Sequence, residues 1–254
     1  MPTEVGRAAG AGDGGLAMPR QPEPPVPRAR RPPRYEIGLL VLVLAVLAWS
    51  GTAPHDRFTW LLEVFPVLLG VPILVATYRR FRFTRLVYTL MALHAIVLMV
   101  GGKYTYAQVP LGDWMRDWLG LARNPYDRIG HLAQGFVPAM VARELLWRRS
   151  PLAGSRWLPF VVVCICLALS AFYELIEWWT AAATGTAAEA FLGTQGDPWD
   201  TQWDMFLALV GSVAALALLS RPHARALGAL AGSGPAGARS TVEFQDPSRG
   251  ERSG

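Results

Sequence analysis

Six apolar segments separated by polar connections dominate the pattern of hydrophobic and polar positions along the chain. We place them near residues 36–53, 58–77, 84–101, 129–147, 157–181 and 203–220. An α-helix rises about 1.5 Å per residue, so segments of this length can cross a hydrocarbon layer of about 30 Å. The fourth segment is the least apolar, because His131, Gln134, Arg143 and Glu144 interrupt it. The pattern predicts an all-α polytopic membrane protein, with a bundle of about six transmembrane helices over residues 35–221.

Composition agrees with a membrane protein and distinguishes the two ends of the chain. Hydrophobic residues make up 52% of the sequence and charged residues 17%, a low charge content for a soluble domain. Residues 1–34 are rich in Gly, Ala, Pro and Arg and lack hydrophobic periodicity. We predict a disordered N-terminal tail over residues 1–34 and a disordered C-terminal tail over residues 222–254.

The basic residues predict the orientation of the helices. The formal net charge is +5, but Lys and Arg flank the apolar segments and form no single patch, so we expect no nucleic-acid partner. When the connections are assigned alternately to two sides, 19 of the 24 Lys and Arg residues fall on one side. The other side carries Arg57, Lys103, Arg116, Arg123 and Arg128. Because cytoplasmic loops are enriched in Lys and Arg, we expect both termini in the cytoplasm.

Polar side chains repeat at helical spacing at the outer ends of three segments. Spacings of i, i+4 and i+7 place side chains on one helix face. The three stripes are Asp127, His131 and Gln134 on the fourth segment, Ser170, Glu174 and Glu177 on the fifth, and Asp200 and Asp204 on the sixth. Ala208, Gly211 and Ala215 continue the sixth stripe as small residues that allow close helix packing. Ionisable residues inside a membrane rarely face lipid, so we expect one shared polar pocket near the periplasmic face. We expect this pocket to be open to the outer face, with Glu63 as a further member.

Carboxylates around one imidazole suit two kinds of chemistry. Acids crowded in a site of low dielectric constant can share protons, which supports general acid–base catalysis or a proton relay. The candidate catalytic residues are Asp127, His131, Glu174, Glu177, Asp200 and Asp204. One histidine with several carboxylates also suits a hard or borderline divalent cation better than a structural zinc ion. The candidate metal ligands are His131, Glu174, Glu177 and Asp204.

Simpler structural roles stay open for the same residues. Asp127 and Asp204 suit the positive N-terminal end of a helix. Glu174 and Glu177 lie at a helix C-terminal end, where negative charge is disfavoured. Their structural alternative is therefore a buried hydrogen-bond network that joins helices.

Three classes of function are consistent with these features. The first is a site that binds, or as an enzyme acts on, an envelope small molecule, a lipid head group or a cation. The second is a small transporter or proton-coupled permease, although no inverted repeat is evident. The third is a structural or assembly protein whose buried acids only join helices. The lipid bilayer is the expected surrounding in each class, a divalent cation is the candidate cofactor, and no Walker loop, serine-nucleophile elbow or zinc-protease motif is present.

Five blocks of sequence resemble those of the YjdF-like bacterial inner-membrane proteins. The blocks are residues 101–106, 110–114, 124–136, 170–179 and 191–205. The resemblance covers roughly residues 36–220 and leaves both tails outside. It implies a small multi-pass protein of the bacterial inner membrane, and it carries no established activity.

A shorter pattern is similar to VanZ-like membrane proteins. It consists of Asp127-Arg-x-x-His131 at the opening of a helix, a later Glu, and an Asp that opens a last helix containing Gly. This similarity implies a role in the cell envelope or in the response to antibiotics.

Overall fold

The computed structural model describes residues 33–185, 189–192 and 194–232 of the chain, and its regular secondary structure in these ranges is helical. The elements are α1 (Arg34–Gly51), α2 (Arg57–Thr77), α3 (Arg85–Tyr104), the 3-10 helix η1 (Tyr106–Gln108), α4 (Pro110–Leu119), α5 (Tyr126–Arg149), α6 (Trp157–Thr184), α7 (Glu189–Leu192) and α8 (Asp200–Gly232). The predicted all-α class is therefore confirmed over the described residues. Residues 1–32 and 233–254, which make up most of the two predicted tails, lie outside them.

Five of the helices, α1, α2, α3, α6 and α8, are long and apolar enough to cross a membrane. The sequence pattern predicted about six. The difference is α5, which has 24 residues but carries charged and polar side chains along much of its length. Its buried residues include Asp127, His131, Arg143 and Glu144, so α5 turns its polar groups toward the other helices.

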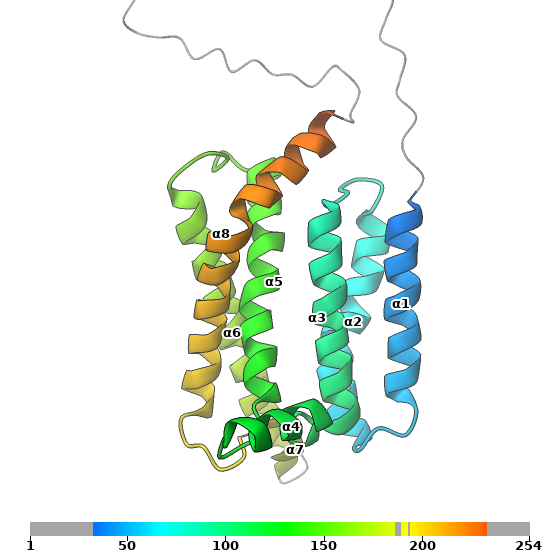
Figure 1. The fold of residues 1–254 in the computed structure, drawn as a ribbon, viewed down its shortest axis with the longest axis vertical. Helices are drawn as coiled ribbons and strands as arrows, with labels where there is room; N and C mark the ends of the chain where they lie inside the picture. The colour runs from blue at the N-terminus through cyan, green and yellow to red at the C-terminus, as the bar shows by residue number, and fades with distance from the viewer. Residues whose placement is uncertain (1–32, 186–188, 193, 233–254) are drawn as a thin grey trace, which may run out of the picture. The chain divides into compact units, whose positions relative to one another are not determined.

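The long helices alternate in direction and form two groups of three (Figure 1). In one group α3 packs against α1 and α2, and in the other α5, α6 and α8 pack against one another. Contacts between α3 and α5 join the groups. The end of the bundle that carries η1, α4 and α7 is called the α4 end below, and α1 begins and α8 finishes at the opposite end (Figure 1).

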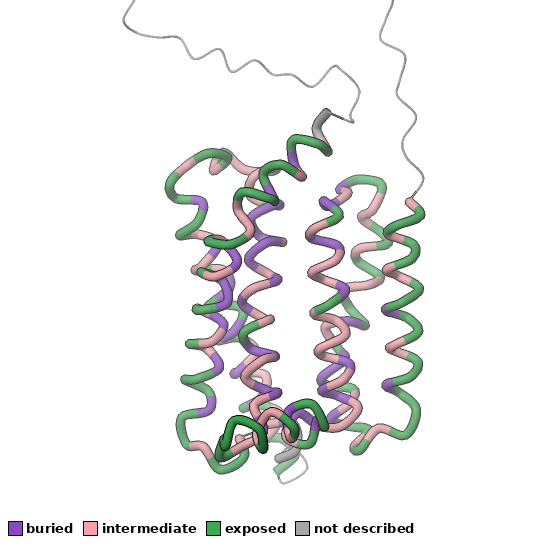
Figure 2. Tube along the Cα trace, in the orientation of Figure 1, coloured by how far each residue is buried: buried purple, intermediate pink, exposed green. Residues whose placement is uncertain are grey.

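The burial pattern is that of a protein surrounded by an apolar medium. Large apolar side chains such as Phe65, Val75, Phe160 and Leu218 are exposed on the outside of the helices. Figure 2 shows buried positions along the length of α5, whereas α1 is mostly exposed. At the α4 end, the amphipathic helix α4 exposes Trp114 and Trp118, whose rings stack at 5.7 Å, as in helices that lie along a membrane interface.

The contact between α5 and α8 is close enough that only glycine fits at two positions. A Cβ atom at Gly135 would overlap the backbone of Ala208, and one at Gly211 would overlap the backbone of Leu132. Ala208 and Ala215 are fully buried in the same seam. The predicted close packing of the small-residue face is therefore confirmed, and it holds the start of α8 against the start of α5.

The last helix is longer than the sequence pattern indicates. That pattern begins the C-terminal tail at residue 222, but α8 continues through Pro222 to Gly232. The extension is rich in Ala and Leu, which favour helix. It also continues a buried face, because His223 and Leu227 are buried and lie four residues apart.

Candidate functional site

The structure brings the three polar stripes together inside the bundle at the α4 end. Asp127 and His131 lie in the first two turns of α5, Glu174 and Glu177 in the last three turns of α6, and Asp200 and Asp204 in the first two turns of α8. All six side chains are buried, with 2–8% of each residue exposed. We call these six residues the acidic cluster.

Local sequence explains why each helix presents its acids here. Asn124-Pro125 starts α5, and the Asn124 side-chain oxygen accepts the Tyr126 backbone N–H at 3.0 Å, so Asp127 falls in the first turn. The apolar run from Trp157 continues α6 through both glutamates without a break. Asp197-Pro198 ends the preceding loop, and Asp200 then begins α8.

His131 lies at the centre of the acidic cluster. Its Nε2 atom is 3.5 Å from Asp127 Oδ1 and 3.8 Å from Asp204 Oδ2. Its Nδ1 atom is 3.8 Å from Glu174 Oε1. The two ring nitrogens therefore face different acids, with α5 and α8 on one side of the imidazole and α6 on the other.

Two sets of side chains around this imidazole have the spacing of cation ligands. One set is Asp127, His131 and Asp204, and the other is His131, Glu174 and Glu177. In each set, one ligand atom per residue lies within 4.8 Å of the others. All four predicted metal ligands belong to one or both sets, and Asp127 joins them.

Several buried polar atoms of this region have no hydrogen-bond partner among the described residues. They include His131 Nδ1, Glu174 Oε1 and Asp204 Oδ1 within the cluster, and Ser170 Oγ and Gln134 Oε1 on the same helix faces. Buried polar groups are normally satisfied, so such a group of orphaned atoms points to a place for a proton, a water or an ion. One imidazole nitrogen with several carboxylate oxygens fits a hard or borderline divalent cation.

Asp200 has a different environment from the other acids. It accepts a hydrogen bond from Arg123 Nη1, and the second Arg123 nitrogen, Nη2, lies 3.3 Å from Asp127 Oδ2. The sequence interpretation placed Arg123 among the charges of the outer connection and did not include it in the site. Its spacing of four from Asp127 was the available signal, although Arg123 precedes the helix.

Aromatic rings and one further acid surround the cluster. Glu63 of α2 is buried and interacts electrostatically with Asp127 and His131. The Tyr173 ring lies 6.5 Å from the His131 ring. Tyr106 of η1 packs so close to Gly101 and Gly130 that a Cβ atom at either position would collide with its ring.

Tyr106 has a strongly shifted acidity. Burial raises the pKa of its phenol well above the usual value, and the nearby Glu63 carboxylate raises it further. The phenol therefore stays protonated at neutral pH and remains a hydrogen-bond donor beside the acids.

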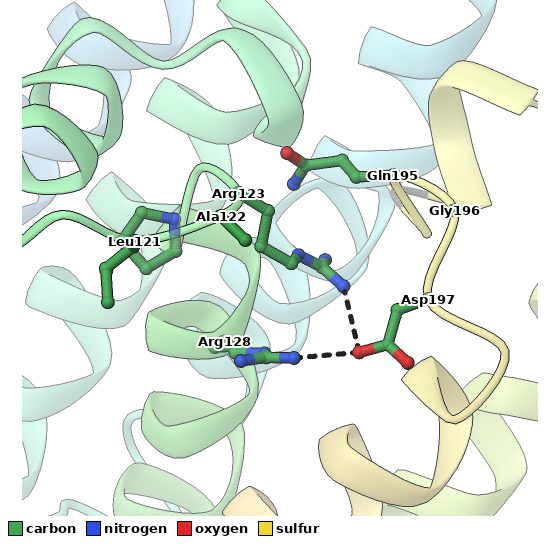
Figure 3. A pocket seen from close by; sticks show the side chains of 8 residues that line it. Leu121, Ala122, Arg123, Arg128, Gln195, Gly196 and Asp197 are labelled. Carbon is green, nitrogen blue, oxygen red and sulfur yellow. Dashed lines mark hydrogen bonds and ion pairs between the residues drawn. The ribbon is translucent and has the colours of Figure 1, made fainter.

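The acidic cluster is enclosed, which differs from the open pocket that the sequence suggested. A cavity of about 330 Å³ lies at the same end of the bundle, and its lining includes Arg123, Arg128, Gln195 and Asp197 but none of the six cluster residues (Figure 3). At this end the connection before α5 and the loop before α8 are joined by two hydrogen bonds between Asn124 and Gln195.

A second buried polar cluster occurs at the opposite end of the bundle. Glu144 of α5 is fully buried and accepts hydrogen bonds from the Thr84 backbone N–H and from Arg148. His223 of α8 also belongs to this cluster, because its Nε2 atom forms a hydrogen bond with Glu144 Oε2. The sequence interpretation missed His223 because residue 223 was assigned to the tail.

Comparison with known proteins places the chain in a family. The model of the family described as "Predicted membrane protein (DUF2238)" matches residues 35–225. The inner membrane protein YjdF of Escherichia coli (strain K12) is 53% identical over 200 residues, which cover 79% of this chain and 95% of that protein. No solved structure matches the chain. These matches confirm the resemblance to YjdF-like proteins, and the chain belongs to the DUF2238 family of membrane proteins.

Proposed function

We propose that this protein binds a divalent cation in the acidic cluster around His131, beneath the outer face of the membrane. The observation that carries the proposal is the pair of ligand sets that share His131, with unpartnered atoms on His131, Glu174 and Asp204. Asp127 and Glu177 are further candidate ligands, because each belongs to one of the two sets. Asp200 is proposed as a member of the same site outside both sets.

Charge balance supports a cation. Five carboxylates of the acidic cluster are buried around one imidazole. In the described part of the chain, the ion pairs of these five acids involve two basic side chains, Arg123 and His131. Buried carboxylates without counter-charges are costly, especially inside a membrane. A divalent cation supplies the positive charge that the side chains lack.

The donor set narrows the identity of the cation. Carboxylate oxygens suit Mg²⁺, Ca²⁺ and Mn²⁺, and an imidazole nitrogen suits Zn²⁺ and other transition metals. A mixed set of one imidazole and several carboxylates therefore favours Mn²⁺ or Zn²⁺. Bound to these residues, such a cation would supply Lewis-acid chemistry.

We further propose that α5 is a sixth membrane span and that both termini are cytoplasmic, in the bacterial inner membrane. α5 packs between α3 and the pair α6 and α8, so neighbouring helices shield its polar groups from lipid. The distribution of Lys and Arg favours the α4 end as the periplasmic end, and the similar E. coli protein is named an inner membrane protein. The test treats intact cells with a membrane-impermeant maleimide. We expect Asp117→Cys to be labelled and Arg225→Cys to remain unlabelled. The reverse result would refute this orientation.

Cation binding is tested with a matched pair of histidine variants. Wild-type protein, His131→Gln and His55→Gln are purified in detergent, stripped with a chelator and titrated with Mn²⁺ or Zn²⁺ by calorimetry. His55 is exposed in the connection between α1 and α2, so His55→Gln is expected to bind as wild type does. His131→Gln is expected to bind at least about tenfold more weakly, because a direct ligand is lost.

Two outcomes would overturn the proposal. One is wild-type protein that binds neither ion, and the other is His131→Gln that binds as tightly as His55→Gln. Glu174→Gln provides a second variant, with the thermal midpoint in detergent measured for each protein. Lower stability without any ion binding in the wild type would instead favour the structural role, in which the acids only join helices.

Packing between the two polar clusters counts against the permease alternative. A transport route along α5 and α8 has to pass the seam where Gly135 and Gly211 contact opposite backbones. Buried apolar residues, including Met140 and Val162, lie in the same core. The acidic cluster is therefore better suited to binding at one face than to passage across the membrane.

A further inference from the structure

A cavity beside the acidic cluster has the features of an anion site. Its volume is about 330 Å³, at the small end of the range for ligand pockets. Its lining includes the guanidinium groups of Arg123 and Arg128, and the loop residues Gln195 and Asp197 (Figure 3). It lies at the α4 end, the same end of the bundle as the acidic cluster.

The two guanidinium groups converge on one oxygen atom. Arg128 Nη2 donates a hydrogen bond to Asp197 Oδ2 at 2.9 Å, and Arg123 Nη1 lies 3.8 Å from the same oxygen. Figure 3 shows both interactions meeting at this carboxylate oxygen. Two arginines around one oxyanion are an arrangement that proteins use for phosphate, because guanidinium groups match its geometry and charge.

Arg128 keeps hydrogen-bonding capacity in this arrangement. Its Nε atom is buried and has no hydrogen-bond partner among the described residues. Its guanidinium lies 5.5 Å from the centre of the Trp203 ring, and this contact holds the group in position. A ligand with several oxygens, unlike one carboxylate, can satisfy more of these donors at once.

Arg123 connects the cavity with the acidic cluster. Its side chain also donates to Asp200 and to Asp127, and Asp127 belongs to one of the two cation ligand sets. An anion held by Arg123 would therefore lie next to the proposed cation.

The loop that carries Asp197 is held in place by a specific pair of hydrogen bonds. The Asn124 backbone N–H donates to Gln195 Oε1 at 3.0 Å, and Gln195 Nε2 donates to the Asn124 carbonyl at 3.0 Å. Gln195 adopts a positive φ of 48°, which is unfavourable for a residue other than glycine. Strained backbone of this kind persists only where its surroundings hold it, and it concentrates at functional sites.

We propose that this cavity binds the phosphate group of an anionic ligand through Arg123 and Arg128, and that Asp197 occupies the position of that phosphate when the ligand is absent. The ligand carries a phosphate group, either as an ester in a lipid head group or as free inorganic phosphate. The inference rests on the proposed cation function only for the placement of the phosphate beside the cation. Binding of the phosphate itself depends on the two arginines.

The test measures phosphate binding by purified full-length protein in detergent. Two probes are titrated by calorimetry, inorganic phosphate and short-chain dihexanoyl phosphatidic acid. Arg128→Gln is expected to weaken binding on the order of tenfold, because a charge-assisted hydrogen bond is lost. Asp197→Asn is expected to strengthen binding several-fold, because it removes the negative charge that competes with the ligand. Arg116→Gln and Asp117→Asn, which alter an exposed ion pair at the same end, are expected to bind as wild type does.

The variants separate phosphate binding from misfolding and from cation binding. Stronger binding by Asp197→Asn cannot result from misfolding. His131→Gln is expected to bind the divalent cation more weakly and to retain phosphate binding, so the two proposals can fail independently. Binding of the short-chain lipid without inorganic phosphate identifies a lipid head group, and binding of inorganic phosphate without the lipid identifies free phosphate. Absence of binding by both wild type and Asp197→Asn, or unchanged binding by Arg128→Gln, would overturn the inference.

Discussion

His223 Nε2 lies 2.9 Å from Glu144 Oε2, and both side chains are fully buried although they are 79 residues apart. The other ring nitrogen, Nδ1, lies 2.5 Å from Arg143 Nη1. Arginine is only a donor, so Nδ1 accepts and the Nε2 hydrogen is donated to Glu144. This pair of interactions joins α5 to the extension of α8, and through Thr84 the Glu144 carboxylate also holds the start of α3.

Replacement of His223 is expected to destabilise this end of the bundle. His223→Ala removes the donor to Glu144 and leaves Arg143 without its acceptor, a loss of about 1–3 kcal/mol in the free energy of unfolding. Arg225→Ala is the control, because Arg225 is exposed on the same helix. Denaturant unfolding in detergent, followed by circular dichroism, measures both. Equal stability of the two variants would contradict the role assigned to His223.

Glycine substitutions test the contact between α5 and α8. Gly211→Ala is expected to lower the free energy of unfolding by about 1–3 kcal/mol, because the added methyl group collides with the Leu132 backbone. Gly70→Ala is the matched change in α2, where a Cβ atom meets nothing within 4 Å, and it is expected to cause no loss. The thermal midpoints in detergent give the comparison. A Gly211→Ala protein as stable as Gly70→Ala would show that the seam is not close-packed.

Asp56, which lies outside the membrane-spanning helices, is expected to make a small, pH-dependent contribution to the free energy of unfolding. Its Oδ1 atom accepts the Thr59 backbone N–H at 2.6 Å at the start of α2, and this hydrogen bond lowers the pKa of the carboxyl group below its usual value. A lowered folded-state pKa stabilises the protein above the unfolded value of about 3.9, and the stabilisation is lost as the pH falls through the folded value.

Two variants of Asp56 separate the cap from its charge. Asp56→Ala is expected to lose about 1 kcal/mol at neutral pH, because it removes the cap. Asp56→Asn keeps an acceptor oxygen and is expected to retain most of that stability, without the pH dependence of the wild type below pH about 4. Unfolding measured from neutral to acidic pH distinguishes them. If the stability of the wild type and of Asp56→Asn changed with pH in the same way, Asp56 would not be the source of the pH dependence.

The residues of the acidic cluster could be predicted from the sequence, but the contacts between them could not. Helical spacing identified the faces of α5, α6 and α8, and the alternation of helix direction placed those faces at one end. The pairing within the cluster was not predictable, because it depends on how each helix is rotated about its axis and on the path of the loops. Arg123 pairs with Asp200 across 77 residues, and no local pattern records such a pairing.

The amino-acid sequence by itself determined the class of protein, the limits of most helices and the residues on each polar face. These are local properties, because segment length and periodicity depend only on neighbouring residues. The tertiary structure alone decided that the cluster is enclosed, that His131 divides its acids into two sets, and that α8 extends to bury His223. Each of these depends on contacts between segments far apart in the chain, where close packing selects one arrangement among many that the same local pattern allows.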